Sequence, residues 1–584
     1  MIALSALLLT FAALQQEPQS GFPGLGAGRQ PLVEIAWNRL YDYDQLYELM
    51  DRLAARWPEM LKMEVIGHSV EKREMRVYTL NNPKTGADTQ KPAMWVDGNI
   101  HGNEVQGGEA VVYAAWYLLE NYGANPRATE LVDRAAFYFL PMVNPDGRAA
   151  WFRDAHNASS SRSGRRPVDD DGDGRFDEDP PDDLDGDGNI VQMRKHTPGE
   201  GRWRLNADDP RVLENVPPTI NGGRGDWTML GSEGTDDDGD GRINEDGPGG
   251  YDMNRSWPSS WQPDHVQNGA GPYPLFWPET RSIARFVLAH SNIAGVQSYH
   301  NNGGMILRGP GAESFGEYPR ADVALYDELG RDGERMLPFY KYMIIWRDLY
   351  TVYGGFVNWT YEGLGIVSFT NELWNESQAG SNAPPAEGQR PPRDEPHFLD
   401  DSLLFGAGFV DWHPVQHPLY GEVEIGGFKK DVGRVPPTFQ IEEMLHRNAL
   451  FALRHAESMP QVVIPSVTSA DLGGGVRAID VVVRNERLIP TRTARAAQRK
   501  IGRPDRLSLS GDGLEVLAGG VRTDRFRPER IELAKRDPAH LELEDGIPSR
   551  GEVRVRWFVR GHGEAVVQFE AEKATAAEAR LKLE

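Results

Sequence analysis

Two residues three positions apart, His101 and Glu104, are of types that bind zinc. They follow an apolar run at 93–96 that predicts a buried strand, and they precede a helical pattern that begins near Glu109. Imidazole nitrogen and carboxylate oxygen are both zinc ligands, and a catalytic zinc typically has three protein ligands and one open position. The pair therefore supplies two of three ligands. Alone, the H-x-x-E spacing is weak, because solvated turns also carry it.

Five further blocks of sequence follow in order along the chain. They are Asn144-Pro-Asp-Gly147, Tyr251-Asp-Met-Asn254-Arg255, Ser298-Tyr-His300, Tyr350-Thr-Val-Tyr-Gly354-Gly355 and Ile366-Val-Ser-Phe-Thr-Asn-Glu372. Together with the His101 block, they resemble the successive signature blocks of the zinc carboxypeptidases of the carboxypeptidase A type. The resemblance spans roughly residues 38–457, although no family residue can be carried over onto the segment at 150–250.

The resemblance implies a complete zinc centre with one Zn²⁺ per chain. It makes His300 the third ligand and Asp252 the partner that orients the first zinc histidine, His101, a role that ligating histidines usually require. Glu372 lies 17 residues after Gly355, the family's interval to its catalytic glutamate. The resemblance therefore makes Glu372 the general base that activates the zinc-bound water and then protonates the leaving amine.

The same resemblance implies a site for a free C-terminal carboxylate. Asn254 and Arg255 match the family's carboxylate-anchoring pair, and a guanidinium can bind a carboxylate with two parallel hydrogen bonds. Tyr350 matches the mobile tyrosine that closes over substrate. Val357 falls where the family's pocket floor lies, and an apolar residue there disfavours selection of Lys or Arg.

One member of the family's site is missing from its usual place. The arginine that polarises the scissile carbonyl normally follows the Asn-Pro-Asp-Gly turn by about fifteen residues, but position 159 is Ser. The first candidate for this role is Arg194, and Arg153 is the second.

Three short repeats interrupt the 150–250 segment, each with alternate aspartates and a Gly at the sixth position. This pattern matches the first half of an EF-hand calcium loop, but the Glu expected at the twelfth position is absent from all three. We expect the loops to bind Ca²⁺; the alternative is a solvated acidic surface. The expected ligands are Asp169, Asp171, Asp173, Asp183, Asp185, Asp187, Asp236, Asp238 and Asp240.

Composition restricts the partners and the compartment. The formal net charge is -24, which argues against nucleic acid, because phosphate backbones need clustered Lys and Arg. Residues 2–14 are mostly apolar and predict a secretory signal peptide, so we expect a secreted or periplasmic protein with no membrane span after its removal. The chain has no cysteine, which excludes disulfides and iron–sulfur clusters.

The periodicity of the chain predicts its domains. Strands alternating with helices indicate an α/β fold with helices on both faces. The resemblance to the zinc carboxypeptidases implies that its central sheet is mixed. We expect a signal peptide at 1–20, a catalytic domain at 30–460 with the Asp-rich insertion at 150–250, and an antiparallel β-sandwich at 465–584. Nothing in the sandwich specifies its partner.

The leading hypothesis is an exported zinc metallocarboxypeptidase that acts on peptides or proteins with a free C-terminus. One alternative keeps the zinc centre but hydrolyses amide bonds of cell-wall peptides. Another is a non-catalytic, calcium-stabilised binding protein, which would have no need of Glu372. Cleavage of peptides with free and amidated C-termini, with and without a zinc chelator, discriminates among the three.

Overall fold

The computed structural model describes residues 30–583 except for short gaps at 156–161, 163, 170–171, 248, 376–394, 525 and 528. The predicted signal peptide and Asp171 lie outside the described residues, so both stay predictions. Within the described ranges, no helix is both long enough and apolar enough to cross a membrane.

A mixed eight-stranded sheet forms the centre of the molecule, with strand order β1-β2-β4-β3-β11-β14-β12-β13. The β3–β4, β3–β11, β11–β14 and β12–β13 pairs are parallel, and the other three are antiparallel. This confirms the predicted mixed sheet. Its strands are β1 (Leu61–His68), β2 (Glu74–Leu80), β3 (Ala93–Gly98), β4 (Ala136–Leu140), β11 (Ile293–Asn301), β12 (Met305–Arg308), β13 (Lys341–Ile344) and β14 (Val367–Leu373).

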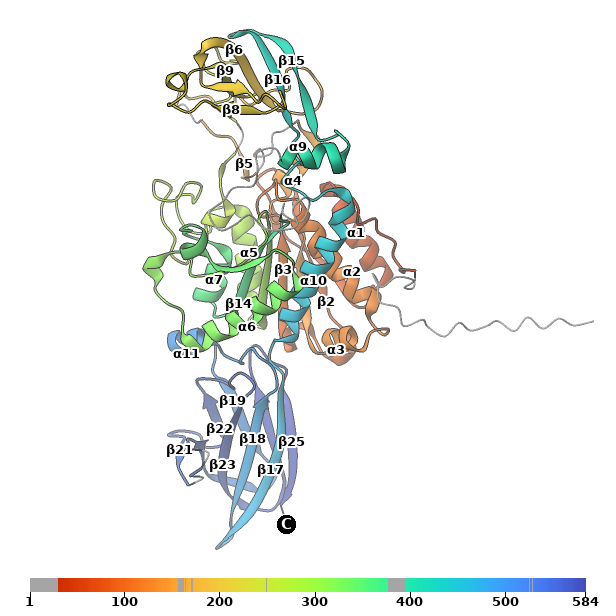
Figure 1. Cartoon of the computed structure of the whole chain (residues 1–584). Helices are drawn as coiled ribbons and strands as arrows, with labels where there is room; N and C mark the ends of the chain where they lie inside the picture. Colours follow the sequence, from red (N-terminus) through yellow and green to blue (C-terminus); the bar gives the residue numbers. More distant parts are fainter. Residues whose placement is uncertain are drawn as a thin grey trace, which may run out of the picture.

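Helices cover both faces of this sheet (Figure 1). Successive side chains of a strand point to opposite faces, and in β3 Met94 and Val96 pack into one core while Ala93 and Trp95 pack into the other. The first core also holds α1 (Tyr43–Arg56), α2 (Gln106–Asn121), α3 (Pro126–Arg134), α6 (Arg320–Met336) and α10 (Ile441–Glu457). The second holds α5 (Pro278–Ala289) and α7 (Phe356–Glu362).

The connection from β3 to α2 is pinned by a close backbone approach. A Cβ added to Gly98 would lie 2.4 Å from the carbonyl oxygen of Gly107, so only glycine allows the end of β3 to meet the first turn of α2. Helix α2 begins at Gln106, three residues before the predicted start. The residues between strand and helix, which include His101 and Glu104, are therefore held tightly over the sheet edge.

The insertion contains a sheet of its own that the sequence did not predict. Its six strands run in the order β15-β16-β6-β9-β7-β8, and two of them come from a distant segment after residue 400. They are β6 (Gln192–Gly201), β7 (Trp203–Leu205), β8 (Leu213–Asn215), β9 (Gly225–Ser232), β15 (Phe409–His417) and β16 (Gly421–Phe428). A two-stranded antiparallel pair, β5 (Gly164–Arg166) with β10 (Gly249–Tyr251), connects the insertion to the catalytic body.

The C-terminal region is an antiparallel β-sandwich, as predicted. Its two sheets have the orders β17-β18-β23-β20-β21 and β22-β19-β24-β25. In β23, Val555, Trp557 and Val559 are fully buried between the sheets, which explains the alternating pattern of the sequence. The strands are β17 (Val462–Gly473), β18 (Val476–Asn485), β19 (Asp505–Ser510), β20 (Leu514–Arg522), β21 (Ile531–Leu533), β22 (His540–Leu543), β23 (Glu552–Gly561), β24 (Gly563–Glu570) and β25 (Ala577–Leu583).

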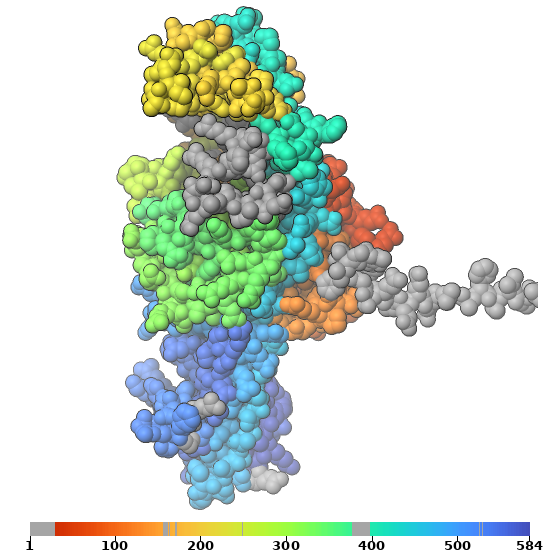
Figure 2. Space-filling model, in the orientation of Figure 1, coloured from red at the N-terminus to blue at the C-terminus, as the bar shows by residue number. Residues whose placement is uncertain are grey.

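The insertion sheet and the sandwich lie at opposite ends of the catalytic body (Figure 2). The sandwich contacts the edge where β11 and β14 begin: Lys573 Nζ donates to the Ile293 carbonyl at 2.7 Å, and Thr493 Oγ1 donates to the Gly365 carbonyl at 2.9 Å. In addition, Asp322 of α6 accepts two backbone N–H groups at the start of α11 (Ala494–Arg499). The sandwich therefore packs against the end of the sheet where β11 and β14 begin.

Candidate active site

Parallel strands bring the predicted metal ligands to one edge of the central sheet. His101 and Glu104 follow the end of β3, whose last residue, Gly98, pairs with the residue before His300 in β11. His300 in turn is in register with Glu372 in β14. The carboxyl ends of these strands therefore converge, as expected for a site in an α/β sheet.

Two imidazole rings face a single carboxylate at this edge. The Nδ1 atom of His101 lies 2.8 Å from Glu104 Oε1, and the Nδ1 atom of His300 lies 3.0 Å from Glu104 Oε2. The two ring centroids are 5.0 Å apart, and all three residues are buried. Residues separated by almost 200 positions in sequence thus form one cluster, as the resemblance implies.

The cluster fits a zinc ion. Its three donor atoms lie within 4.8 Å of one another, close to the spacing of about 3.4 Å between ligands bound tetrahedrally at about 2.1 Å. Asp252 Oδ1 lies 3.1 Å from Nε2 of His101. That contact fixes the ring so that Nδ1 is the nitrogen presented to a metal.

Electrostatics favour the anionic form of the two carboxylates at this cluster. Burial alone would raise the pKa of Glu104, but the adjacent His101 and His300 rings lower it well below its usual range. Burial acts in the same direction on Asp252, yet Arg255 and His101 lower its pKa as well. Both carboxylates are therefore anionic at neutral pH.

Glu372 faces the same cavity of about 320 Å³ that the metal cluster lines. Burial and the nearby Glu104 carboxylate raise the pKa of Glu372 to about 7. A carboxylate with a pKa near 7 can both accept and release a proton at neutral pH.

The predicted carboxylate-binding residues line this cavity too. The guanidinium of Arg255 donates to the carbonyl of Asn254 at 2.9 Å and lies 3.8 Å from Asp252. The Asn254 side chain accepts the first N–H of α7, from Phe356, at 2.9 Å, which ties the residue to the element that forms one wall. Tyr350 also lines the cavity and is 49% exposed, so it has room to move.

The structure corrects the placement of the carbonyl-polarising arginine. Arg194 lies in β6 of the insertion sheet, where it is bonded to Glu424 at 2.7 Å and stacked between Trp227 and Trp412. It does not line the cavity. The second candidate, Arg153, pairs with Asp44 at 2.6 Å on the surface.

Two arginines that the sequence analysis missed do line the cavity, Arg162 and Arg434. Arg162 Nη1 donates to Glu104 Oε1 at 2.9 Å, and its Nη2 lies 3.2 Å from His101 Nε2. Arg162 is the fifteenth residue after Gly147, so counting from the end of the Asn-Pro-Asp-Gly turn would have identified it. Burial lowers the pKa of Arg434, which follows the insertion strands, and no motif marked it.

The Asp-rich loops form separate groups of carboxylates in the insertion. Asp169 and Asp187 accept backbone N–H groups of their own loops. The described residues group into the following sets, each with donor atoms within 4.8 Å of one another: Asp173, Glu178 and Asp238; Asp179, Asp238 and Glu245; Asp183, Asp185 and Glu233; Asp236, Asp238 and Asp240. Among the described residues, the only other group of this kind is the cluster of His101, Glu104 and His300, called the zinc-type cluster below.

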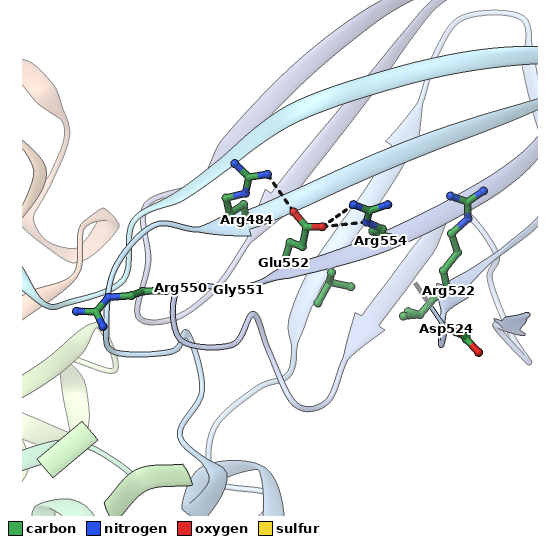
Figure 3. A pocket seen from close by; sticks show the side chains of 9 residues that line it. Arg484, Arg522, Asp524, Arg550, Gly551, Glu552 and Arg554 are labelled. Atoms are coloured by element: carbon green, nitrogen blue, oxygen red, sulfur yellow. Dashed lines mark hydrogen bonds and ion pairs between the residues drawn. The ribbon is translucent and has the colours of Figure 1, made fainter. Parts of the chain in front are cut away.

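A larger hollow of about 530 Å³ lies on the sandwich, and the charged side chains described below that line it form ion pairs with other protein groups (Figure 3). Glu552 pairs with Arg484 at 3.0 Å and with Arg554 at 2.7 Å. Two further arginines, Arg522 and Arg550, pair with carboxylates of other elements at 3.1 and 2.6 Å. The hollow offers no group comparable to Glu372 or to the zinc-type cluster.

Curated relatives match parts of this chain. Carboxypeptidase D of Mus musculus is 32% identical over 125 residues, which cover 21% of this chain and 9% of the relative. Carboxypeptidase A1 of Rattus norvegicus is 25% identical over 349 residues, which cover 59% of this chain and 64% of the relative. The chain thus spans less than two thirds of the length of these relatives.

Solved structures with a similar arrangement include thrombin activatable fibrinolysis inhibitor, at 17% identity, and carboxypeptidase A from Helicoverpa armigera, at 16%. Their TM-scores are 0.42 and 0.43, and each match covers 72% of this chain and 75% of the other. A domain family of unknown function matches residues 461–583, which are the sandwich. The profile described as zinc carboxypeptidase matches residues 46–185 and 226–395, more than half of the sequence, and the chain therefore belongs to the zinc carboxypeptidase family.

Proposed function

We propose that this protein is a zinc metallocarboxypeptidase that removes residues from the C-terminus of peptides. One observation carries the proposal: a single cavity is lined by the His101, Glu104 and His300 cluster, by Glu372, and by Arg255. Metal ligands, a base and a carboxylate anchor are the three parts that hydrolysis of a C-terminal peptide bond needs.

His101, Glu104 and His300 would hold the zinc, with Asp252 keeping His101 in the correct orientation. When bound there, zinc supplies a Lewis acid that polarises the scissile carbonyl and makes water more acidic. Two nitrogen donors and one oxygen donor form a set typical of catalytic zinc sites.

Glu372 acts as the base and then as the acid in this proposal. It accepts a proton from the attacking water and passes that proton to the leaving amine, which needs a carboxylate of roughly neutral pKa. Its position in register with His300 places it beside the metal cluster rather than across the cavity from it.

The cavity selects substrate by its free carboxylate. Arg255 binds the C-terminal carboxylate with charge-assisted hydrogen bonds, and Tyr350 moves over the bound residue to exclude water. Arg162, beside Glu104, is positioned to hydrogen-bond the scissile carbonyl oxygen as charge develops on it. Apolar side chains, including Leu307, Ile345 and Val357, line the same cavity and favour an apolar C-terminal residue.

Peptides that differ only at the C-terminus test the proposal. The protein is incubated with a peptide that ends in Phe or Leu and with its C-terminal amide, with and without a zinc chelator. We expect release of the last residue from the free acid only, with loss of activity in the chelator. Equal cleavage of the amide would exclude a carboxypeptidase and favour a zinc amidase.

A pair of arginine variants sharpens this assay. Arg255→Met removes the carboxylate anchor, so we expect kcat/KM for the free acid to fall by about 30-fold to 1,000-fold, the range for loss of one buried charged partner. Arg281→Met changes an exposed arginine of α5 and is the control. Equal loss in both variants would remove Arg255 from the site.

A further inference from the structure

Two segments of the insertion are copies of one another. Residues 169–179 and 236–246 share nine of 11 positions, reading Asp-Asp-Asp-Gly-Asp-Gly-Arg, then Phe or Ile, then Asp or Asn, then Glu-Asp. Together they contain 13 acidic residues and two arginines. The similarity extends past the predicted loops to a Glu-Asp pair, Glu178-Asp179 or Glu245-Asp246, that the loop pattern alone did not include.

The two copies share the same turn geometry in the residues that the structure describes, which leave out 170 and 171. The first aspartate of each, Asp169 or Asp236, accepts the N–H groups of the two loop glycines at 2.6 to 3.1 Å. Gly172 and Gly239 have φ of 85° and 86°, and Gly174 and Gly241 have φ of 96° and 95°. A side chain at any of these glycines would be strained, so the turn geometry depends on them.

The copies also pair with one another. Asp179 and Asp246 form an antiparallel bridge, with N–H to carbonyl distances of 3.2 and 3.3 Å in the two directions. The Asp237 N–H donates to Asp179 Oδ1 at 3.3 Å. This pairing brings Asp179 of one copy to Asp238 and Glu245 of the other, with donor oxygens within 4.8 Å.

One carboxylate oxygen of this group is fully buried without a hydrogen-bond partner among the described residues. Asp179 has no exposed surface, and its Oδ2 atom has no hydrogen-bond partner among the described residues. Both side-chain oxygens of Glu245 are also buried without a hydrogen bond within the described chain. Asp179 and Asp238 each accept one backbone N–H group, at 3.3 and 2.9 Å, but the other Asp179 oxygen and both Glu245 oxygens have no such partner among the described residues. Three carboxylates this close together repel one another and lose hydration, a cost that a bound cation would offset.

We propose that the two copies together form one calcium site, with Asp179, Asp238 and Glu245 among its ligands. The donors are all carboxylate oxygens, which hard cations prefer, and the set has no nitrogen or sulfur that would favour zinc. Glu245 supplies the carboxylate that each single loop lacks at its twelfth position. The sequence analysis predicted calcium in these loops without Asp179 or Glu245 among its ligands.

The third loop, at 183–188, provides a contrast. Its nearby glutamate, Glu233, already accepts N–H groups from Val191 at 2.7 Å and Leu184 at 3.2 Å. Asp185 pairs with His413 at 2.9 Å. Unlike Asp179 and Glu245, neither Glu233 nor Asp185 has a buried oxygen without a partner among the described residues, so the third loop serves as the matched control.

The position of the site connects it to the cavity. The first copy begins three residues after β5, and Arg162 lies two residues before that strand; the second copy ends three residues before β10, and Asp252 follows that strand directly. Calcium would therefore clamp the ends of the β5–β10 pair and hold Arg162 and Asp252 in place. This consequence, unlike the site itself, rests on the proposed function.

Calcium titration of the full chain tests the site. Protein dialysed against EGTA is titrated with CaCl₂ by calorimetry, and its unfolding temperature is measured with and without Ca²⁺. We expect binding by the unaltered chain and by Asp185→Asn, with a rise of several degrees in unfolding temperature, since an ion that binds only the folded state stabilises it. Absence of binding, or equal loss in Asp185→Asn and Asp179→Asn, would overturn the proposal.

The Asp179→Asn variant separates a ligand from a merely structural residue. Without Ca²⁺, we expect it to unfold at the same temperature as the unaltered chain or higher, because one buried charge is gone. With Ca²⁺, we expect no further rise. An unfolding temperature lowered equally in both buffers would mean that Asp179 stabilises the fold without binding an ion.

Peptidase activity tests whether calcium binding affects the cavity. We expect Ca²⁺ to raise peptidase activity of the EGTA-treated chain, whose zinc content is measured in parallel, and to leave that of Asp179→Asn unchanged. Calcium binding without any effect on activity would exclude the clamp but keep the site. Failure of the proposed function would leave the calorimetric result intact.

Discussion

The zinc-type cluster and the paired Asp-rich copies concentrate metal donors in opposite ways. His101, Glu104 and His300 come from strands and loops far apart in the chain, and the fold of the central sheet brings them together. The Asp-rich copies gather oxygen donors within a few residues of one another, on turns that their own glycines allow. Mixed nitrogen and oxygen donors suit zinc, and oxygen alone suits calcium.

This difference shows what each site depends on. The zinc-type cluster forms only when the central sheet is folded. The sheet fixes its geometry, and contacts such as that of Asp252 with His101 orient the ligands. The Asp-rich turns form locally, yet Asp179 becomes a donor for the second copy only through the pairing of the two copies. Variants in each region should therefore affect different properties.

The largest expected effect is on catalysis at the sheet edge. Glu372→Gln keeps the size of the side chain but cannot accept a proton, so we expect kcat to fall by about two to four orders of magnitude. Zinc content should stay the same, because Glu372 is not one of the three proposed ligands. A variant with normal kcat would remove Glu372 as the base.

Arg162 lines the cavity and Arg194 lies in the insertion sheet, so replacing each should affect a different property. Arg162→Met should lower kcat by about 100-fold to 1,000-fold, the usual effect of removing one donor to a developing oxyanion. Arg194→Met should leave kcat unchanged but lower the free energy of unfolding by about 1 to 3 kcal/mol, because its contacts with Trp227, Trp412 and Glu424 are lost.

Steady-state kinetics and denaturant unfolding of both arginine variants give the answer. If Arg194→Met lost activity while Arg162→Met kept it, the carbonyl-polarising arginine would be Arg194, as the sequence predicted, and not Arg162.

Glu279 shows a third way to bury a carboxylate, by binding a proton instead of a metal. Burial raises its pKa to about 7, above the ordinary value of 4.5. The folded state therefore holds the proton more tightly than the unfolded state, so this contribution to stability is present below pH 4.5 and is lost as pH rises through 7.

The expected size of this loss is at most about 3 kcal/mol, from the pKa difference. Glu279→Gln keeps a hydrogen-bond acceptor for Tyr251 and Val70 but has no charge to bury. Its unfolding free energy at pH 8 should exceed that of the unaltered chain, and the difference should shrink towards pH 5. Urea unfolding at several pH values measures this, and a difference independent of pH would contradict it.

Sequence reasoning succeeded where a pattern is tied to one element. Continuous apolar runs predicted the buried strands that lead to His101 and His300, and the alternation in β23 marks the sandwich. These elements could be placed because each buries a face that the sequence displays directly.

The sequence did not predict structures that are built from segments far apart in the chain. The insertion sheet contains only a small core, around Met193, Val423 and Ile425, shared between segments more than 200 residues apart, so neither segment shows a strong pattern alone. Arg434, which follows the second segment in sequence, lines the cavity, and no motif in the sequence marks it. Pairing of the two acidic copies also depends on folding, although their repeat was visible in the sequence.

Zinc content tests the central claim most directly. Metal analysis of the purified chain, of His300→Ala and of Asp238→Asn should give one zinc per chain for the first and third and none for His300→Ala. Retention of a full equivalent of zinc by His300→Ala, or loss of zinc in Asp238→Asn alone, would contradict the assignment of zinc to the cluster at the sheet edge.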